Sequence, residues 1–343
     1  MNGAQSLLQT LVNCEVEVCF GNPGTSEMHF VAALDSVPQM RSVLCLFEGV
    51  VTGAADGYGR VAGKPAATLL HLGPGLANGL ANLHNARRAS TPLVNIVGDH
   101  ATYHLQYDAP LTSDIVGFAR PVSSWIHESK NADSVASDAA RAVQAARAAP
   151  GGVSTLILPA DTAWNEARRA EQKLPDLLPA PVSPDAIDAA ARLLSNGKKT
   201  ALLLRGAALY GAGLEAAGRV QAKTGARLLC DTFAPHAELG AGRVPVERIP
   251  YFAEQIVDFL KDFEQIIFVG AKPPVSFFAY PGKPSWCVPE GSHLSYLAHA
   301  HQDGAQALAA LADTLGAPAR SPVRIPLQLS ELPNGPLTAL GVA

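Results

Sequence analysis

Short apolar runs alternate with amphipathic, alanine-rich segments over the first half of the chain. The apolar runs have the length of buried strands, and the segments between them have helical periodicity. The pattern predicts strands over 16–20, 42–47, 66–71, 92–97 and 153–158, and helices over 4–13, 26–35, 48–62, 76–89 and 134–149. Continuous apolar strands separated by helices indicate a parallel sheet that is covered on both faces.

A second unit of the same kind follows a proline-rich segment. Its predicted strands are 200–204, 226–230 and 265–269, and its predicted helices are 184–195, 212–224, 252–262 and 302–315. Charge followed by clustered prolines is typical of a linker. We therefore expect an α/β chain of two consecutive three-layer domains with parallel sheets. The expected boundaries are a domain over 1–165, a linker over 166–183, a domain over 184–316 and a second linker from 317.

The chain closes on LTALGVA, which follows several prolines. Proline ahead of an apolar, helix-forming run is how a helix commonly starts. We interpret 317–343 as a linker and the beginning of a third domain, with a frayed tail as the alternative.

Composition narrows the class of protein. Apolar residues make up 48% of the 343 residues and charged residues 16%, with a net charge of −4 and no Lys/Arg run. Nucleic acid and acidic membrane surfaces are therefore not expected as partners. The odd number of cysteines, five, without any CxxC indicates buried thiols in a reducing cytosol. Because no secretory signal and no run of 18 apolar residues is present, we expect a cytoplasmic protein without a membrane span.

Three predicted strands end in segments that suit a ligand site. Glu48 directly follows the second strand and opens a helix, where its carboxyl group either caps the helix or faces a ligand. FGNPGTSE (20–27) follows the first strand, and HLGPGLANG (71–79) follows the third. Parallel neighbours open on one edge of a sheet, and glycines there let a ligand approach the backbone.

These segments, in this order and with EGVVTGAADGYGR (48–60) between them, resemble the pyrimidine-binding domain of thiamine diphosphate (ThDP) enzymes. The similar groups are acetolactate synthase and benzoylformate decarboxylase. The resemblance covers residues 1–165, and 184–316 resembles the family's central Rossmann-like domain, in which some members hold FAD. The resemblance implies a ThDP- and Mg²⁺-dependent decarboxylase or carboligase for small 2-oxo acids or acyloins, assembled as a homodimer or homotetramer.

The resemblance also assigns roles to residues. Glu48 lies at the position of the glutamate whose protonated carboxyl drives the aminopyrimidine of ThDP to its imino form, which an apolar setting favours. His71 and Thr25 lie where benzoylformate decarboxylases carry an active-site histidine and serine. Either residue would shuttle protons or orient a substrate carboxylate. Pro23, Gly24, Gly73 and Asn78 would lie in loops beside the cofactor.

The chain also departs from these relatives. Pro110, Leu111 and Ser124 stand where acetolactate synthases carry a phenylalanine, a glutamine and a lysine for the second substrate, and Asp99 replaces a usual glutamine. No GDG motif for Mg²⁺ and diphosphate occurs. We therefore expect this chain alone neither to hold ThDP tightly nor to turn over substrate, and we expect the magnesium ligands in a third domain.

Other interpretations stay open. A dinucleotide-dependent oxidoreductase would use RGAALYGAGLE (205–215) with Asp231 at the next strand end. A non-catalytic binding or regulatory protein would explain the missing diphosphate motif. A zinc site on His100 and His104, spaced i, i+4, lacks the glutamate of HExxH and a third ligand.

Overall fold

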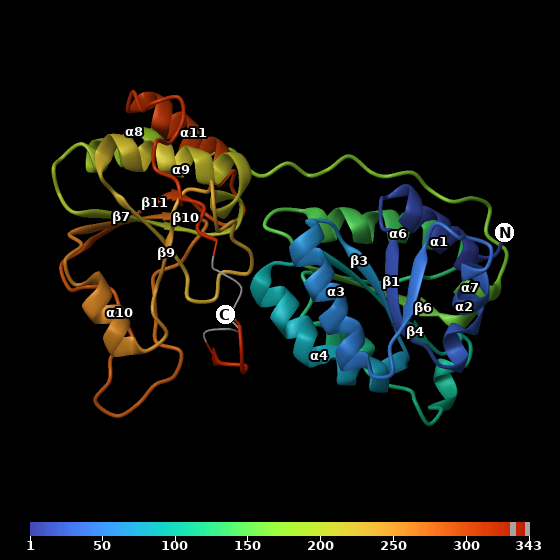
Figure 1. Cartoon of the computed structure of the whole chain (residues 1–343). Helices are drawn as coiled ribbons and strands as arrows, with labels where there is room; N and C mark the ends of the chain where they lie inside the picture. Colours follow the sequence, from blue (N-terminus) through green and yellow to red (C-terminus); the bar gives the residue numbers. More distant parts are fainter. Residues whose placement is uncertain (330–333, 340–343) are drawn as a thin grey trace. The chain divides into compact units, whose positions relative to one another are not determined.

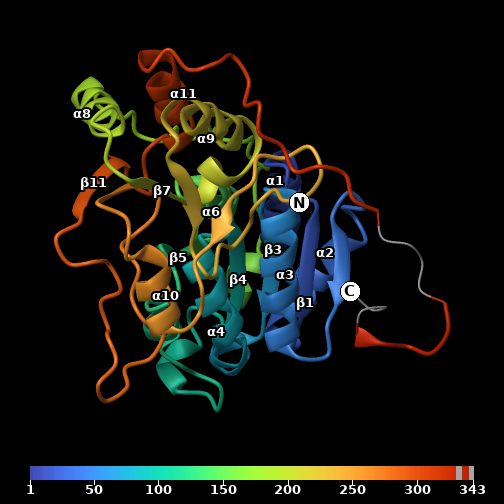
Figure 2. The ribbon, with the colours of Figure 1, turned by 60° about the vertical axis from the view of Figure 1, so that its left-hand side comes forward.

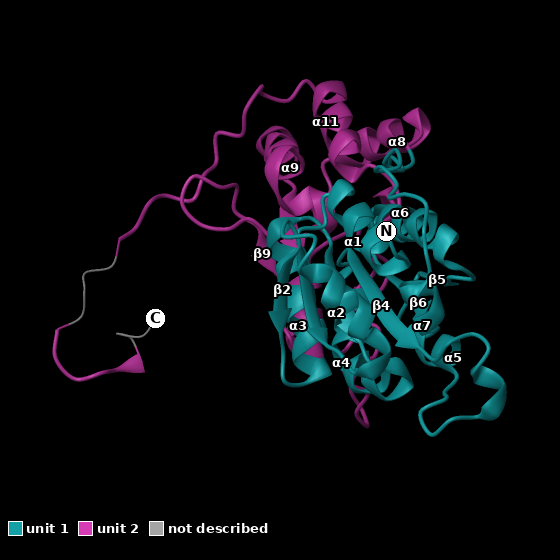
Figure 3. Ribbon diagram, turned by 90° about the vertical axis from the view of Figure 1, so that its right-hand side faces the viewer, with its two compact units in different colours: residues 1–180 teal, residues 181–343 magenta. Residues whose placement is uncertain are grey.

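The computed structural model describes residues 1–329 and 334–339, and the chain forms two compact units, Met1–Ala180 and Pro181–Ala343 (Figure 3). Each unit, called unit 1 and unit 2 below, is a parallel sheet with helices packed on both faces. The predicted α/β class and three-layer architecture are confirmed. None of the described helices has the length and apolarity that crossing a membrane requires.

Unit 1 contains a six-stranded parallel sheet with the order β2-β1-β3-β4-β6-β5. Its strands are β1 (Val18–Asn22), β2 (Arg41–Leu44), β3 (Ala66–Leu70), β4 (Leu93–Asp99), β5 (Trp125–Glu128) and β6 (Val153–Pro159). β3, β4 and β6 are buried along their whole length, because helices cover both of their faces. β2 is a mostly exposed edge strand that ends at Leu44, so the predicted strand over 42–47 was too long.

Helices cover the two faces of this sheet in separate groups (Figures 1 and 2). One face carries α1 (Gly3–Asn13), α2 (Met28–Leu34), α6 (Ala132–Arg147) and α7 (Ala160–Trp164). The other carries α3 (Glu48–Ala62), α4 (Leu72–Ala89) and α5 (Ile115–Ala119). Short 3₁₀ turns are η1 (Thr25–Glu27) and η2 (Leu105–Tyr107).

The helix ends follow local sequence signals. Asn2 and Gln5 form a capping box at the start of α1, and the Asn131 side chain caps α6. Gly63, in the left-handed region at φ 66°, ends α3. The apolar stripe of α1 is fully buried, and burying each of its leucines contributes about 1.5–3 kcal/mol.

The segment after α7 has little regular structure but is attached to unit 1. The Glu171 backbone N–H donates to Thr10 Oγ1 (3.0 Å), and Ser6 Oγ donates to the Arg169 carbonyl (2.7 Å). The Gln144 side chain donates to the Pro175 carbonyl (2.7 Å). Unit 1 therefore extends along this segment to Ala180.

Unit 2 has a five-stranded parallel sheet with the order β11-β10-β7-β8-β9. Its strands are β7 (Thr200–Leu204), β8 (Arg227–Cys230), β9 (Glu247–Arg248), β10 (Gln265–Val269) and β11 (His293–Ala298). α8 (Pro184–Leu194), α9 (Gly211–Thr224) and α11 (Gly304–Thr314) cover one face, and α10 (Ala253–Leu260) covers the other (Figure 1). The turn η3 (Gly206–Leu209) precedes α9.

Two sequence expectations concern the end of β8 and the last residues of the chain. Asp231, the residue that a dinucleotide would need, forms an ion pair with Arg205, which follows β7. Its carboxylate is thus engaged within the protein. The expected start of a third domain within 337–343 lies mostly outside the described residues.

Candidate active site

The carboxyl ends of β1, β2 and β3 meet at one edge of the unit 1 sheet, because these strands are parallel neighbours. The chain leaves β1 toward α2 on one face and leaves β3 toward α4 on the opposite face. The direction of winding therefore reverses between β1 and β3, and ligands of open α/β sheets bind at such a reversal. The three turns open on one edge, as the sequence predicted.

Glu48 lies at this edge as the first residue of α3. Its side chain is half-buried, and its Oε2 accepts a hydrogen bond from Asn78 Nδ2 (3.1 Å). Two contacts hold α3 against α4 beside it: Thr52 Oγ1 donates to the Gly79 carbonyl (3.0 Å) and Asn82 Nδ2 to the Gly49 carbonyl (2.7 Å). Glu48 on α3 and its partner Asn78 on α4 therefore lie on two helices that are fixed to each other.

His71 forms a second group with a residue to which the sequence analysis gave no role. Its Nδ1 lies 2.7 Å from Glu27 Oε2, and the same oxygen accepts the Gly24 backbone N–H (2.7 Å). Glu27 is 1% exposed, and its Oε1 is buried with no hydrogen-bond partner. The sequence does contain a pattern that points to Glu27. It lies three residues after Gly24, which is the capping-box position of a short helix.

Glycines bring these two groups together. A Cβ on Gly75 would lie 3.5 Å from Glu48 Oε1 and 3.4 Å from the Cβ of His71. A Cβ on Gly24 would strike the His71 ring at 2.4 Å. Glycine is thus required at both positions, where the turns after β1 and β3 converge.

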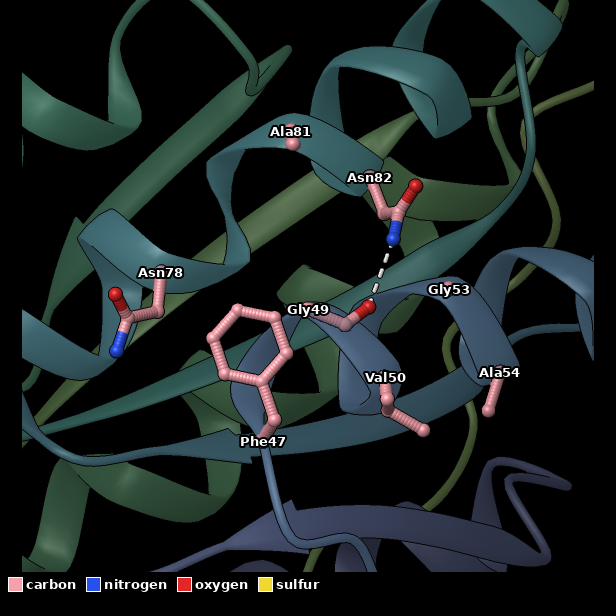
Figure 4. A pocket seen from close by; sticks show the side chains of 8 residues that line it. All are labelled: Phe47, Gly49, Val50, Gly53, Ala54, Asn78, Ala81 and Asn82. Atoms are coloured by element: carbon pink, nitrogen blue, oxygen red, sulfur yellow. Dashed lines mark hydrogen bonds between the residues drawn. The ribbon is translucent and has the colours of Figure 1, made fainter.

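An apolar hollow of about 520 Å³ adjoins Glu48, between α3 and α4 (Figure 4). The Phe47 ring lies over Gly49, where a Cβ would be 2.3 Å from it. Val50, Ala54 and Ala81 extend the apolar wall, with Asn78 and Asn82 beside them. Phe47 and Val50 are about half exposed, so the hollow opens to the outside.

The structure places the other predicted site residues differently. Thr25 is exposed and lines a separate cavity with His29 and His100, while Pro23 only continues the turn to Gly24. Gly73 and Asn78 are not in a loop, because α4 already begins at Leu72. The predictions that Gly73 and Asn78 lie in loops and that this helix begins at 76 were therefore wrong, since proline is tolerated in the first turn of a helix.

Leu72, the first residue of α4, has a φ of 50° although it is fully buried and not a glycine. Such a conformation costs about 1–3 kcal/mol and occurs most often at ligand and active sites. It directly follows His71, so the strained residue lies next to the Glu27–His71 contact.

Two of the residues at which the chain departs from acetolactate synthases are Ser124 and Asp99. Ser124 precedes β5 and donates to the Val153 carbonyl (3.1 Å), so it lies at the amino end of the strands, away from the Glu48 edge. Asp99 ends β4 and is 7% exposed. Burial raises the pKa of the Asp99 carboxyl, although its Oδ1 accepts the His100 backbone N–H (2.7 Å).

Burial also raises the pKa of Glu27, against the opposing effects of the Gly24 N–H and His71. The folded state therefore binds this proton more tightly than the unfolded chain. The resulting stability is fully present below the unfolded pKa of about 4.3 and is lost as the pH rises through the folded pKa.

Glu27→Gln keeps an acceptor for Gly24 but does not titrate. We expect the unfolding free energy of this variant, relative to the natural chain, to rise with pH above about pH 4.3. Urea unfolding of both proteins between pH 4.5 and 8, an interval chosen around that pKa, measures the difference. The contribution of Asp99 to the pH dependence is present in both proteins and drops out of the difference between them. A difference that stays constant with pH would contradict the expectation.

Comparison with known proteins agrees with this geometry. The family model for the thiamine pyrophosphate enzyme, N-terminal TPP binding domain, matches residues 1–119. A putative acetolactate synthase large subunit, IlvX, of Mycobacterium tuberculosis is 52% identical over 343 residues, which is 100% of this chain and 66% of that protein. A benzoylformate decarboxylase of Pseudomonas aeruginosa is 33% identical over 52% of this chain and 33% of its own length. The chain belongs to the family of ThDP-dependent enzymes.

Solved structures show the same fold. A putative thiamin diphosphate-dependent enzyme from Mycobacterium smegmatis superposes with a TM-score of 0.82 at 22% identity, over 100% of this chain and 69% of its own. A ThDP-dependent 4-hydroxybenzoylformate decarboxylase from Rhodococcus jostii RHA1 has a TM-score of 0.79 at 21% identity, over 98% and 66%. The chain thus spans about two thirds of the length of these proteins.

Proposed function

We propose that this chain carries the cofactor-activating part of a ThDP-dependent decarboxylase or carboligase that acts on small 2-oxo acids or acyloins. One observation carries the proposal. A glutamate carboxylate, held by Asn78, lies at the winding reversal of the sheet, beside an apolar hollow and a partly buried histidine–glutamate pair.

These residues fit the pyrimidine of ThDP. A planar heteroaromatic ring needs a carboxyl group at its edge and apolar walls along its faces. Glu48 supplies the carboxyl group, and Phe47 and the glycines of α4 supply apolar surface and close approach. When bound, ThDP serves as the electron sink for a carbanion formed by decarboxylation or acyloin cleavage.

The residues of the chain then hold and move protons. Asn78 fixes the orientation of the Glu48 carboxyl group, which would hold the pyrimidine and exchange a proton with one of its ring nitrogens. Glu27 Oε2 and His71 Nδ1 share a proton across 2.7 Å, which leaves His71 Nε2 to exchange a proton with a substrate.

The test is an assay of the protein encoded by the full reading frame. Supplied with ThDP and Mg²⁺, it should decarboxylate or ligate at least one of pyruvate, benzoylformate and a panel of acyloins. Carbon dioxide release and product chromatography follow the two reactions separately. A protein that binds ThDP but turns over none of these compounds would contradict the proposal.

We further propose that the protein forms a homodimer through the outer surface of α3. Leu46 (90% exposed), Phe47 and Val50 form an apolar surface there that continues into the hollow. Contiguous exposed apolar surface of this kind marks interaction sites. Such an assembly, as the resemblance implies, would cover the hollow next to Glu48.

Val50→Asp tests this assembly, because a buried unpaired charge is strongly unfavourable at an interface. We expect the dissociation constant of the dimer to rise at least about tenfold, since each 1.4 kcal/mol changes it by that factor. Analytical ultracentrifugation measures it. Leu178→Asp, at a residue that is 86% exposed in the segment after α7, is the matched control and should leave the association unchanged.

A further inference from the structure

A second cavity of about 250 Å³ opens at the same sheet edge, beyond the carboxyl ends of β1, β4 and β6. Three imidazoles and three hydroxyl groups line it together with an indole. The residues are Thr25, Ser26, His29, His100, Tyr103, His104 and Trp164. Among the described residues that line it, none carries a carboxylate.

The imidazoles are held by ring contacts and by the loop after β4. The His29 ring packs on Trp164 with a centroid distance of 5.5 Å, and the rings of His100 and His104 lie 5.5 Å apart. The loop is tied to α7, because Thr102 donates from its N–H (2.9 Å) and its hydroxyl (2.6 Å) to the Asp161 carboxylate. The histidines thus come from two walls that are fixed relative to each other.

Two acids near this cavity, Asp161 and Asp99, already have donors, whereas Glu27, which follows Ser26, keeps a buried Oε1 without a partner. Both oxygens of Asp161 accept from Thr102, and Asp99 Oδ1 accepts the His100 N–H. The imidazoles are less satisfied, since His100 Nε2 is buried without a hydrogen-bond partner. An imidazole keeps at least one N–H donor in either protonation state. In the part of the chain that is described, no group of three or more His, Cys, Asp or Glu side chains is placed to hold a metal ion.

The cavity is linked to the candidate active site by consecutive residues. Thr25 and Ser26 line it, and the next residue, Glu27, contacts His71 at 2.7 Å. The cavity and the Glu27–His71 contact therefore share one turn of the chain, residues 25–27, at this edge of the sheet.

We propose that this histidine cavity binds a carboxylate, namely the second acidic group of a 2-oxo dicarboxylic acid substrate. The cavity offers several N–H and O–H donors and no competing acceptor charge in its lining, which is the arrangement that recognises an anion. The substrate class rests on the proposed function, whereas the carboxylate site itself does not.

The experiment uses residues 1–343 with succinate as the probe, which is a dicarboxylate that cannot react. Histidine-selective NMR resolves the ten histidines of the chain. We expect succinate to shift the signals of His29, His100 and His104 in a saturable manner and to leave His84, exposed on α4, unchanged. Succinamide, the neutral analogue, should not produce these shifts.

The variant His29→Phe/His104→Phe removes two donors at exposed positions and keeps aromatic rings there. Its succinate dissociation constant should rise about tenfold, as expected for loss of charge-assisted hydrogen bonds. His84→Phe is the matched control and should bind like the natural chain. Absence of saturable shifts, equal binding of succinamide, or unchanged affinity in the double variant would each overturn the proposal. Because no ThDP is present, such a result would not affect the assignment of Glu48.

Discussion

Glu48→Gln should lower kcat/KM of the protein encoded by the full reading frame by at least about a hundredfold, the usual scale for losing a positioned proton donor. The amide has the same size, and its oxygen can still accept from Asn78, so α3 and α4 should stay in place. It lacks an acidic proton to give to a ring nitrogen. Steady-state kinetics at saturating ThDP, with circular dichroism and thermal unfolding of the same preparations, separates chemistry from folding.

Two further variants make this result specific. Glu48→Asp keeps the acid but shortens its reach, so it should retain more activity than Glu48→Gln. Glu17→Gln changes an exposed glutamate that pairs with Lys64 before β1, and it should behave like the natural protein. Turnover of Glu48→Gln close to that of the natural protein would defeat the assignment of Glu48.

The helix that begins at Glu48 shows what sequence alone can establish. The apolar run before it, the small residues along it and Gly63 after it are all local, and the predicted bounds of 48–62 match α3. Parallel pairing then brings three strand ends to one edge, because a βαβ chain has few alternatives. The fold class followed from these local patterns, whereas the role of Glu48 came from the resemblance to ThDP enzymes and stays a prediction.

The Glu27–His71 pair shows what remained hidden. The two residues are 44 positions apart, and their contact depends on how the turns after β1 and β3 pack on each other. No local pattern encodes that packing. The start of α4 was missed for a related reason, since glycine and proline in 73–75 indicate a turn unless tertiary contacts fix them as a first helical turn. β11 was missed because only its last two residues are buried, as on an edge strand.

Gly98→Ala should destabilise unit 1 by about 1–3 kcal/mol, the usual cost of inserting a methyl group into a filled interior. A Cβ there would lie 1.7 Å from Glu27 Oε1 and 2.6 Å from its Cδ. The Glu27 carboxyl cannot turn away freely, because Gly24 and His71 both hold its other oxygen in a buried setting. The substitution should therefore also break the contact between Glu27 and His71, which NMR of the His71 ring can follow.

A double-variant cycle identifies the clash as the cause. Shortening the acid in Glu27→Ala/Gly98→Ala removes the colliding atoms, so the double variant should lose less stability than the sum of the two single variants. Gly57→Ala is the control, because a Cβ there meets nothing within 4 Å and alanine in a helix interior gains about 0.5–1 kcal/mol. Strict additivity, or a Gly98→Ala protein as stable as the natural one, would mean that Glu27 has room to move. The carboxyl group would then not be fixed against His71, and the proton that the two side chains share would have no defined position.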